Sequence, residues 1–220
     1  ISVSNRDLSW IAAHELEYPE LRVEIRSQRT YPLNTTLAHV LGYVGEVSSE
    51  QLKKEEYKTL NPGAIIGKGG LEQYYDKYLR GKDGYREVVV DSRGRIQSEI
   101  RAVPPQAGQD LLTTIDLDLQ NTAESQLANS TTKRGTIIIM NPNDGGILAM
   151  ASAPSFDPNI FSSKSKTPEG KKEITAYNTN KETPLINRAI QGRYPPGSTW
   201  KIPEPVAGLA AARRQIPLNG

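Results

Sequence analysis

The chain has 220 residues, of which 36% are hydrophobic, and its 27 basic and 25 acidic side chains give a formal net charge of +2. A chain of this length holds one large domain or two smaller ones, and a charge this close to balance gives no broad positive field that would attract nucleic acid. No cysteine is present, which excludes disulfides, thiolate metal sites and cysteine nucleophiles.

The first sixty residues are predicted to contain short elements separated by turns. Residues 21–32 alternate apolar and polar side chains, as a half-buried strand does. Residues 36–60 predict a short helix, a glycine-rich turn and then a polar helix from Ser48.

Residues 70–108 predict a helix, a hairpin and a boundary. The helix over residues 70–81 carries large apolar side chains on one side, and we expect its tyrosines to pack in the core: Leu71, Tyr74, Tyr75, Tyr78 and Leu79. Residues 84–100 predict a β-hairpin. The Pro-Pro pair within residues 103–108 is typical of a linker between two regions.

The remaining sequence predicts a helix that packs on strands. Residues 110–115 predict a strand, and Asp116 is expected to cap the helix that follows, whose apolar stripe is Leu119, Ala123 and Leu127. Residues 135–140 and 146–151 predict a hairpin, with the first strand buried on both faces of a larger sheet. Residues 157–182 are polar and lack periodicity, so a mobile loop is expected.

Residues 194–201 (YPPGSTWK) place a serine three positions before a lysine. Positions i and i+3 share one face of a helix, so the hydroxyl of Ser198 and the amine of Lys201 can meet and form an activated nucleophile. Residues 130–133 and 163–166 also match Ser-x-x-Lys, but they lie in polar segments with no predicted helix. The motif alone leaves open a plain helix cap at Ser198 with an exposed Lys201.

Several long segments around this motif resemble one family. Residues 183–201 resemble the active-site approach of class B penicillin-binding proteins, and more narrowly of the elongation type, penicillin-binding protein 2. Residues 37–52 and 66–95 resemble the non-catalytic linker region of that family, and residues 108–124 and 135–159 resemble the opening of its transpeptidase domain. Long matches in the family's order are far more specific than a four-residue pattern.

The resemblance implies an α+β fold in two parts. Residues 1–107 would form a β-rich, extended linker or pedestal region of the dimerisation type. Residues 108–220 would form the N-terminal portion of a transpeptidase domain, an antiparallel sheet with packed helices. The family's Ser-x-Asn and Lys-Thr-Gly motifs are absent from the sequence, so the catalytic domain is expected to be incomplete after Ser-x-x-Lys. Pro203 and Pro205 put a regular nucleophile helix in doubt, because each removes a helix hydrogen bond.

The resemblance further implies a peptidoglycan D,D-transpeptidase of cell-wall elongation, with Ser198 as nucleophile and Lys201 as general base. Stem peptides and β-lactam antibiotics would both acylate Ser198. No metal or cofactor is expected, since His14 and His39 are too few and too far apart for a metal site or a Ser-His triad. An alternative is that the chain as it stands is a catalytically incomplete binding module. A β-lactamase or β-lactam sensor is a further alternative, against which the linker-like segments argue.

The resemblance also implies partners in the rod-elongation machinery, namely the scaffold protein MreC and a SEDS-family glycosyltransferase. It implies a parent protein at the periplasmic face of the bacterial inner membrane with one N-terminal anchor. No apolar run in the sequence approaches the ~18 residues of a membrane span, so this anchor is expected to precede the chain.

Overall fold

A computed structural model describes residues 3–14, 17–18, 21, 23, 27–92, 96–162 and 165–213. In chain order its elements are α1 (Asn5–Ala13), α2 (Ala38–Leu41), β1 (Val44–Glu46), η1 (Gln51–Lys53), β2 (Ile65–Gly67), α3 (Gly70–Tyr74), α4 (Asp76–Leu79), β3 (Tyr85–Val90), β4 (Ile96–Val103), α5 (Leu117–Asn129), β5 (Gly135–Met140), β6 (Ile147–Ala153), α6 (Asn159–Ser162), α7 (Pro168–Thr179), α8 (Arg188–Gln191), η2 (Gly197–Lys201) and α9 (Pro203–Arg213). These strands form three antiparallel pairs, and helices pack against β1–β2 and β5–β6. The α+β class predicted from the sequence is confirmed.

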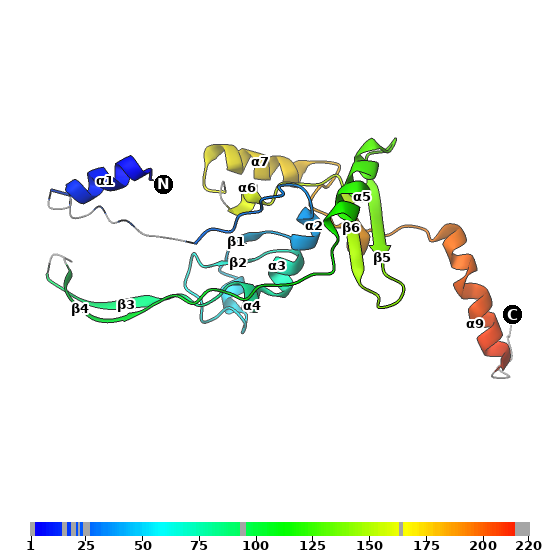
Figure 1. Ribbon diagram of the computed structural model, residues 1–220, viewed down its shortest axis with the longest axis horizontal. Coiled ribbons are helices and arrows are strands. Elements are labelled where there is room, and N and C mark those ends of the chain that lie inside the picture. The colour runs from blue at the N-terminus through cyan, green and yellow to red at the C-terminus, as the bar shows by residue number, and fades with distance from the viewer. Residues whose placement is uncertain are drawn as a thin grey trace.

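The three strand pairs occupy different parts of the molecule (Figure 1). The β1–β2 pair lies near the centre, beside α2 and α3. The β3–β4 hairpin extends away from this centre as a two-stranded ribbon, toward the end where α1 lies. On the other side α5 lies along β5–β6, and α9 projects beyond them.

A compact core lies between α5 and the β5–β6 hairpin. The carboxylate of Asp116 accepts the N–H groups of Asp118 and Leu119, both at 3.0 Å, and so begins α5. The buried side chains of this core are Ala123, Leu127, Ala149 and Ala151. The predicted cap, stripe and hairpin are therefore confirmed. The prediction that both faces of the first strand are buried is wrong: α5 covers one face only, and Ile138 and Met140 are 45% and 55% exposed on the other.

A buried glutamine ties α5 to the edge of β6. The side chain of Gln120 is fully buried, its Oε1 accepts the N–H of Met150 at 2.8 Å, and its Nε2 donates to the carbonyl of Met150 at 3.2 Å. The Gln120 amide thus forms hydrogen bonds with both the N–H and the carbonyl of Met150, as the backbone of a neighbouring strand would.

The single helix predicted over residues 70–81 is wrong in two respects. The structure has two short helices, α3 and α4, separated at Tyr75, whose φ of −105° and ψ of 17° are not helical. Tyr74 and Tyr78 are 81% and 55% exposed, so they do not form a core. The residues that face inward are Glu72 and Asp76, which find hydrogen-bond partners there.

Two further predictions from the first 115 residues are wrong, and a third, the strand over residues 21–32, lies partly outside the described residues. The described residues of 21–32 lie in no strand, and the others fall outside the described part of the chain. The polar helix from Ser48 is reduced to the 3₁₀ turn η1. Residues 110–115 form no strand; the hydroxyl of Thr114 instead donates to the carbonyl of Ile147 at 2.7 Å. Helix α1 was not predicted, although Ser4 and Asp7 form a capping box at its start.

The mobile loop predicted over residues 157–182 is also wrong, because this segment contains α6 and α7. Thr167 caps α7 by accepting the N–H of Gly170 at 3.1 Å. Pro168 occupies the first turn, where a missing N–H breaks no helix hydrogen bond. In α6, the ring of Phe161 stacks on Tyr43 with 4.1 Å between centroids, which joins this segment to β1.

Candidate active site

Ser198 and Lys201 both lie in η2, and both side chains are exposed. A 3₁₀-helix has three residues per turn, so side chains at i and i+3 lie directly above one another. No hydrogen bond to either side chain occurs among the residues that the structure describes. Gly197 precedes Ser198 with φ of +54°, a left-handed conformation that glycine adopts readily. The turn therefore presents the serine hydroxyl and the lysine amine on one side, open to solvent.

The two prolines after Lys201 begin a new helix. The 3₁₀ turn ends at Lys201, and α9 begins at Pro203. Pro203 and Pro205 fall in the first turn of α9, where backbone N–H groups have no partner within the helix. The nucleophile candidate is thus carried on a separate turn before a regular helix.

The other two Ser-x-x-Lys matches have structural roles. The hydroxyl of Ser130 donates to the carbonyl of Leu127 at 2.7 Å and accepts the N–H of Lys133 at 3.1 Å, which closes the end of α5. In the third match, the amine of Lys166 pairs with the carboxylate of Glu46, and Ser163 lies outside the described residues.

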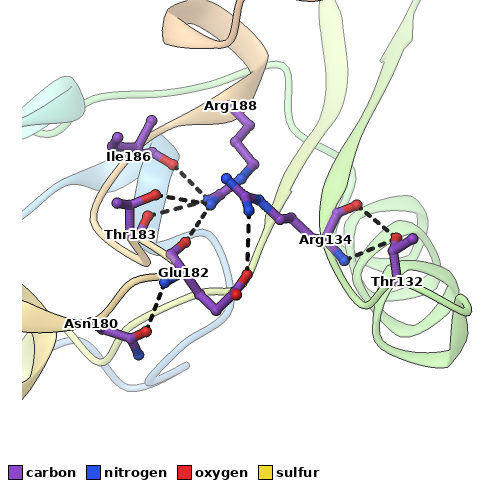
Figure 2. A network of polar contacts seen from close by, with 7 residues as sticks. All are labelled: Thr132, Arg134, Asn180, Glu182, Thr183, Ile186 and Arg188. Carbon is purple, nitrogen blue, oxygen red and sulfur yellow. Dashed lines mark hydrogen bonds and ion pairs between the residues drawn. The ribbon is translucent and has the colours of Figure 1, made fainter.

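The segment before η2 is held by a buried arginine that the sequence analysis did not single out (Figure 2). Arg188, at the start of α8, is 3% exposed. Its guanidinium donates to the carbonyl oxygens of Glu182, Thr183 and Ile186, and to the hydroxyl of Thr183 at 3.1 Å. Burial lowers the pKa of Arg188, and Arg134 lowers it further.

An outer set of contacts surrounds this arginine (Figure 2). Arg134 lies 3.5 Å from the carboxylate of Glu182, and the N–H of Glu182 donates to the Asn180 side chain at 2.8 Å. Arg134 is half exposed, whereas Arg188 is enclosed. One arginine thus binds the backbone of the turn at residues 182–186, and the other binds a side chain on its surface.

The same turn is also joined to α2, in the first half of the chain. The Nε2 of His39 lies 2.7 Å from the carbonyl oxygen of Pro184, and the side-chain amide of Asn187 donates to the carbonyl of His39 at 3.2 Å. Asn187 also caps α8 by accepting the N–H of Ala189 at 3.0 Å. Burial lowers the pKa of His39, which favours the neutral ring. These partners are more than a hundred residues apart, so local sequence patterns gave no signal of them.

Neither of two surface pockets includes the serine–lysine pair. A pocket of about 480 Å³ is lined by residues of β1, α6 and α7, and also by Tyr43 and Lys68. A pocket of about 340 Å³ is lined by Leu111, Leu112 and neighbouring residues. Within the described ranges no group of three or more histidine, aspartate or glutamate side chains is arranged to hold a metal ion. None of the helices in the described part of the chain is long and apolar enough to cross a membrane.

Curated proteins similar to this chain are named peptidoglycan D,D-transpeptidases. Peptidoglycan D,D-transpeptidase MrdA of Escherichia coli K12 is 39% identical over 91% of the chain, and MrdA of Acinetobacter baumannii is 37% identical over 95%. These alignments cover 31% and 30% of the two relatives, so the chain spans about a third of their length.

Solved structures show the same relationship. The chain resembles penicillin-binding protein 2 in a complex with MreC from Helicobacter pylori, with 29% identity, a TM-score of 0.69, and coverage of 91% of this chain and 36% of that one. It also resembles Pseudomonas aeruginosa penicillin-binding protein 2 in complex with WCK 5153, with 33% identity, a TM-score of 0.61, and coverage of 87% and 36%.

Two domain families match the chain in succession. The penicillin-binding protein dimerisation domain matches residues 2–113, and the penicillin-binding protein transpeptidase domain matches residues 135–213. The second range contains Ser198, Lys201 and the turn that Arg188 holds. The chain therefore belongs to the penicillin-binding protein family.

Proposed function

We propose that the protein carrying this chain is a peptidoglycan D,D-transpeptidase of cell-wall elongation that acts through an acyl-enzyme on Ser198. The observation that carries this proposal is the position of Ser198 and Lys201 on one side of a single 3₁₀ turn inside the range matched by the transpeptidase domain. The identity to MrdA proteins over more than nine-tenths of the chain supports the same reaction. Because the chain spans about a third of those relatives, this activity belongs to the whole protein.

In the proposed reaction the Oγ of Ser198 bonds to the carbonyl carbon of the penultimate D-Ala of a stem peptide, while its proton passes to the amine of Lys201. The C–N bond to the terminal D-Ala then breaks, and Lys201 returns the proton to the leaving amine. An amine of a neighbouring stem peptide then bonds to the acyl carbon and gives its proton to Lys201. The bond from that carbon to the Oγ of Ser198 breaks, and Lys201 returns the proton to this oxygen. The backbone N–H of Ser198 supplies half of the oxyanion hole. A β-lactam is attacked in the same way and stays bound as the opened ring.

Labelling of the full-length protein with a fluorescent penicillin tests this proposal. Ser198→Ala is expected to abolish covalent labelling, and Lys201→Met is expected to slow it by about 10²- to 10⁴-fold, the usual range for loss of a general base. Ser130→Ala is the matched control, because Ser130 belongs to another Ser-x-x-Lys match but closes a helix end. Undiminished labelling of the Ser198→Ala protein would contradict the proposal.

A second candidate function is partner binding: on their own, the 220 residues would act as a binding module. They contain no Ser-x-Asn or Lys-Thr-Gly segment, and the β3–β4 ribbon exposes several apolar side chains: Tyr85, Val89, Val90, Ile96 and Ile100. The similar structure that contains MreC supports MreC as a partner. We propose a SEDS-family glycosyltransferase as a further partner, and the periplasmic face of the inner membrane as the place of action.

The two candidates are separated by experiments on the 220-residue chain itself. A binding module is expected to bind purified MreC and to take up no fluorescent penicillin. Stable labelling of this chain at Ser198 would refute the binding-module proposal.

A further inference from the structure

Arg188 is unusual because it is buried without a carboxylate partner. Charged side chains are almost never fully buried unless they are paired. No ion pair to Arg188 occurs among the described residues, and the nearby carboxylate of Glu182 contacts Arg134 instead (Figure 2). The guanidinium is satisfied by three carbonyl dipoles and one hydroxyl, all from residues 182–186. This side chain therefore serves the backbone of one turn.

That turn needs such support. Thr183 has φ of +46°, a left-handed conformation that β-branched residues rarely adopt. The guanidinium of Arg188 contacts both the carbonyl oxygen and the hydroxyl of Thr183, so it holds the strained residue from two sides. The backbone N–H of Arg188 donates to the hydroxyl of Ser152 at 3.0 Å. This hydrogen bond attaches the start of α8 to β6.

A short segment that contains two prolines connects this anchor to Ser198. Gly192 follows the end of α8, and its N–H donates to the carbonyl of Arg188 at 3.2 Å. A Cβ at Gly192 would lie 2.5 Å from that carbonyl oxygen and 2.4 Å from the ring of Tyr194, so the chain is closely packed here. Two prolines with fixed φ and one glycine then lead to Ser198. A shift of the turn is therefore carried forward to the nucleophile.

We propose that Arg188 is a positioning residue for acylation. Its guanidinium holds the turn at residues 182–186, and the position of this turn determines where residues 192–197 place Ser198. This inference rests on the proposed function, since it takes Ser198 as the residue that is acylated. Arg188 touches no reacting atom and acts through the backbone.

The test is acylation of the full-length protein by a fluorescent penicillin, resolved into the dissociation constant of the non-covalent complex and the rate constant for acylation. Arg188→Lys keeps the charge and loses the planar fork of donors that reaches several carbonyls at once. We expect the acylation rate constant to fall by about 10- to 100-fold, as misplacement by about 1 Å does, and the dissociation constant to change by less than about 3-fold. Rates are normalised to the fraction of molecules that can be acylated at all.

Arg134→Lys is the matched control. It changes the same residue type in the same network, but among the described residues the side chain of Arg134 binds only the exposed carboxylate of Glu182, so the acylation rate constant is expected to stay within about 2-fold. Thr183→Val is a milder variant that removes one hydroxyl contact of Arg188 and keeps the side-chain shape. It is expected to lower the acylation rate constant in the same direction, by a smaller factor.

The outcomes are distinguishable. An Arg188→Lys protein that acylates at the wild-type rate overturns the inference. A protein that loses only the fraction of acylatable molecules, with an unchanged rate constant in the remainder, also overturns it, because Arg188 would then serve stability alone. If wild-type protein is not acylated at Ser198, the proposed function fails instead.

Discussion

His39 and Pro184 lie in contact although 145 residues separate them in the sequence, with 2.7 Å between the Nε2 of the ring and the carbonyl oxygen of the proline. His39 belongs to α2 in the range matched by the dimerisation domain, and Pro184 to the turn before α8 in the range matched by the transpeptidase domain. The ring also meets Phe156 edge-on, with 5.2 Å between centroids. This buried histidine therefore connects the ranges matched by the two domain families.

Stability is expected to depend on pH through His39. Burial lowers its pKa from 6.5 in the folded protein, and Arg188 lowers it too, whereas the contact with Pro184 and the charge of Glu124 raise it. The unfolded chain thus binds a proton more readily than the folded one, so this contribution is complete above pH 6.5 and is lost as pH falls from 6.5 toward the lower folded value.

We expect the free energy of unfolding, measured by urea denaturation between pH 5 and 8, to show this loss in the wild type. His39→Gln keeps an N–H donor toward Pro184 but cannot titrate, so this pH-dependent loss of stability should be absent from the variant. Identical pH profiles for both proteins would exclude His39 as the source.

Arg29 and Glu72 are expected to be energetically coupled. The Nε of Arg29 lies 2.8 Å from the Oε1 of Glu72, which also accepts a hydrogen bond from Tyr31 at 3.3 Å. Burial raises the pKa of Glu72, and Arg29 and Tyr31 oppose that rise. Arg29→Met is expected to destabilise the protein by about 1–3 kcal/mol, because it leaves a buried carboxylate without its charge partner. The lower end of this range is expected, because the Arg29 side chain is 39% exposed and solvent screens its charge.

A double-mutant cycle measures this coupling by chemical denaturation. Glu72→Gln introduced into the Arg29→Met protein should recover part of the lost stability, since a neutral amide no longer needs the cation. Additivity of the two changes within about 0.5 kcal/mol would mean that the pair is not coupled.

Local signals in the sequence predicted the elements whose stabilising contacts are also local. Asp116 caps α5 through residues two and three positions away, and the stripe of Ala123 and Leu127 meets the next hairpin along the chain. The β3–β4 and β5–β6 hairpins follow from apolar runs on either side of turn residues.

Long-range partners account for the failures at residues 70–81 and at Arg188, whereas α1 and α7 were missed despite local cap signals. Tyr74 and Tyr78 were expected in the core, but the inward face of that segment is occupied by Glu72, whose partners Arg29 and Tyr31 lie more than 40 residues away. A sequence pattern cannot show that a carboxylate has such partners, and without them its burial is unfavourable. Arg188 was missed for the same reason, since an arginine that binds backbone carbonyls has no sequence signature.

Asp116→Ala is expected to destabilise the protein by about 1 kcal/mol, the usual cost of losing a helix N-cap. Its carboxylate accepts two backbone N–H groups that would otherwise have no partner in α5. Thermal unfolding followed by circular dichroism measures the change. Ser125→Ala, at an exposed position of the same helix, is the control and is expected to change stability by less than about 0.5 kcal/mol. Equal effects of the two substitutions would show that the cap contributes nothing measurable.

Gly192 is expected to accept no side chain. Its φ of −69° is ordinary, so the restriction comes from space: a Cβ would lie 2.5 Å from the carbonyl oxygen of Arg188 and 2.4 Å from the ring of Tyr194. Gly192→Ala must increase both distances, and the resulting shift of the chain at Gly192 moves residues 193–198. We expect the acylation rate constant of the full-length protein to fall by about 3- to 30-fold, as small misplacements of reacting groups do.

Gly208→Ala provides the contrast, because nothing lies within 4 Å of a Cβ at this position in α9. That substitution is expected to leave the acylation rate unchanged and to stabilise α9 by about 0.5–1 kcal/mol, as alanine does relative to glycine within a helix. Comparison of the two alanine variants separates crowding at Gly192 from the general effect of adding a methyl group. If both acylate at the wild-type rate, the ring of Tyr194 moves aside freely, and the packing at Gly192 does not determine where Ser198 lies.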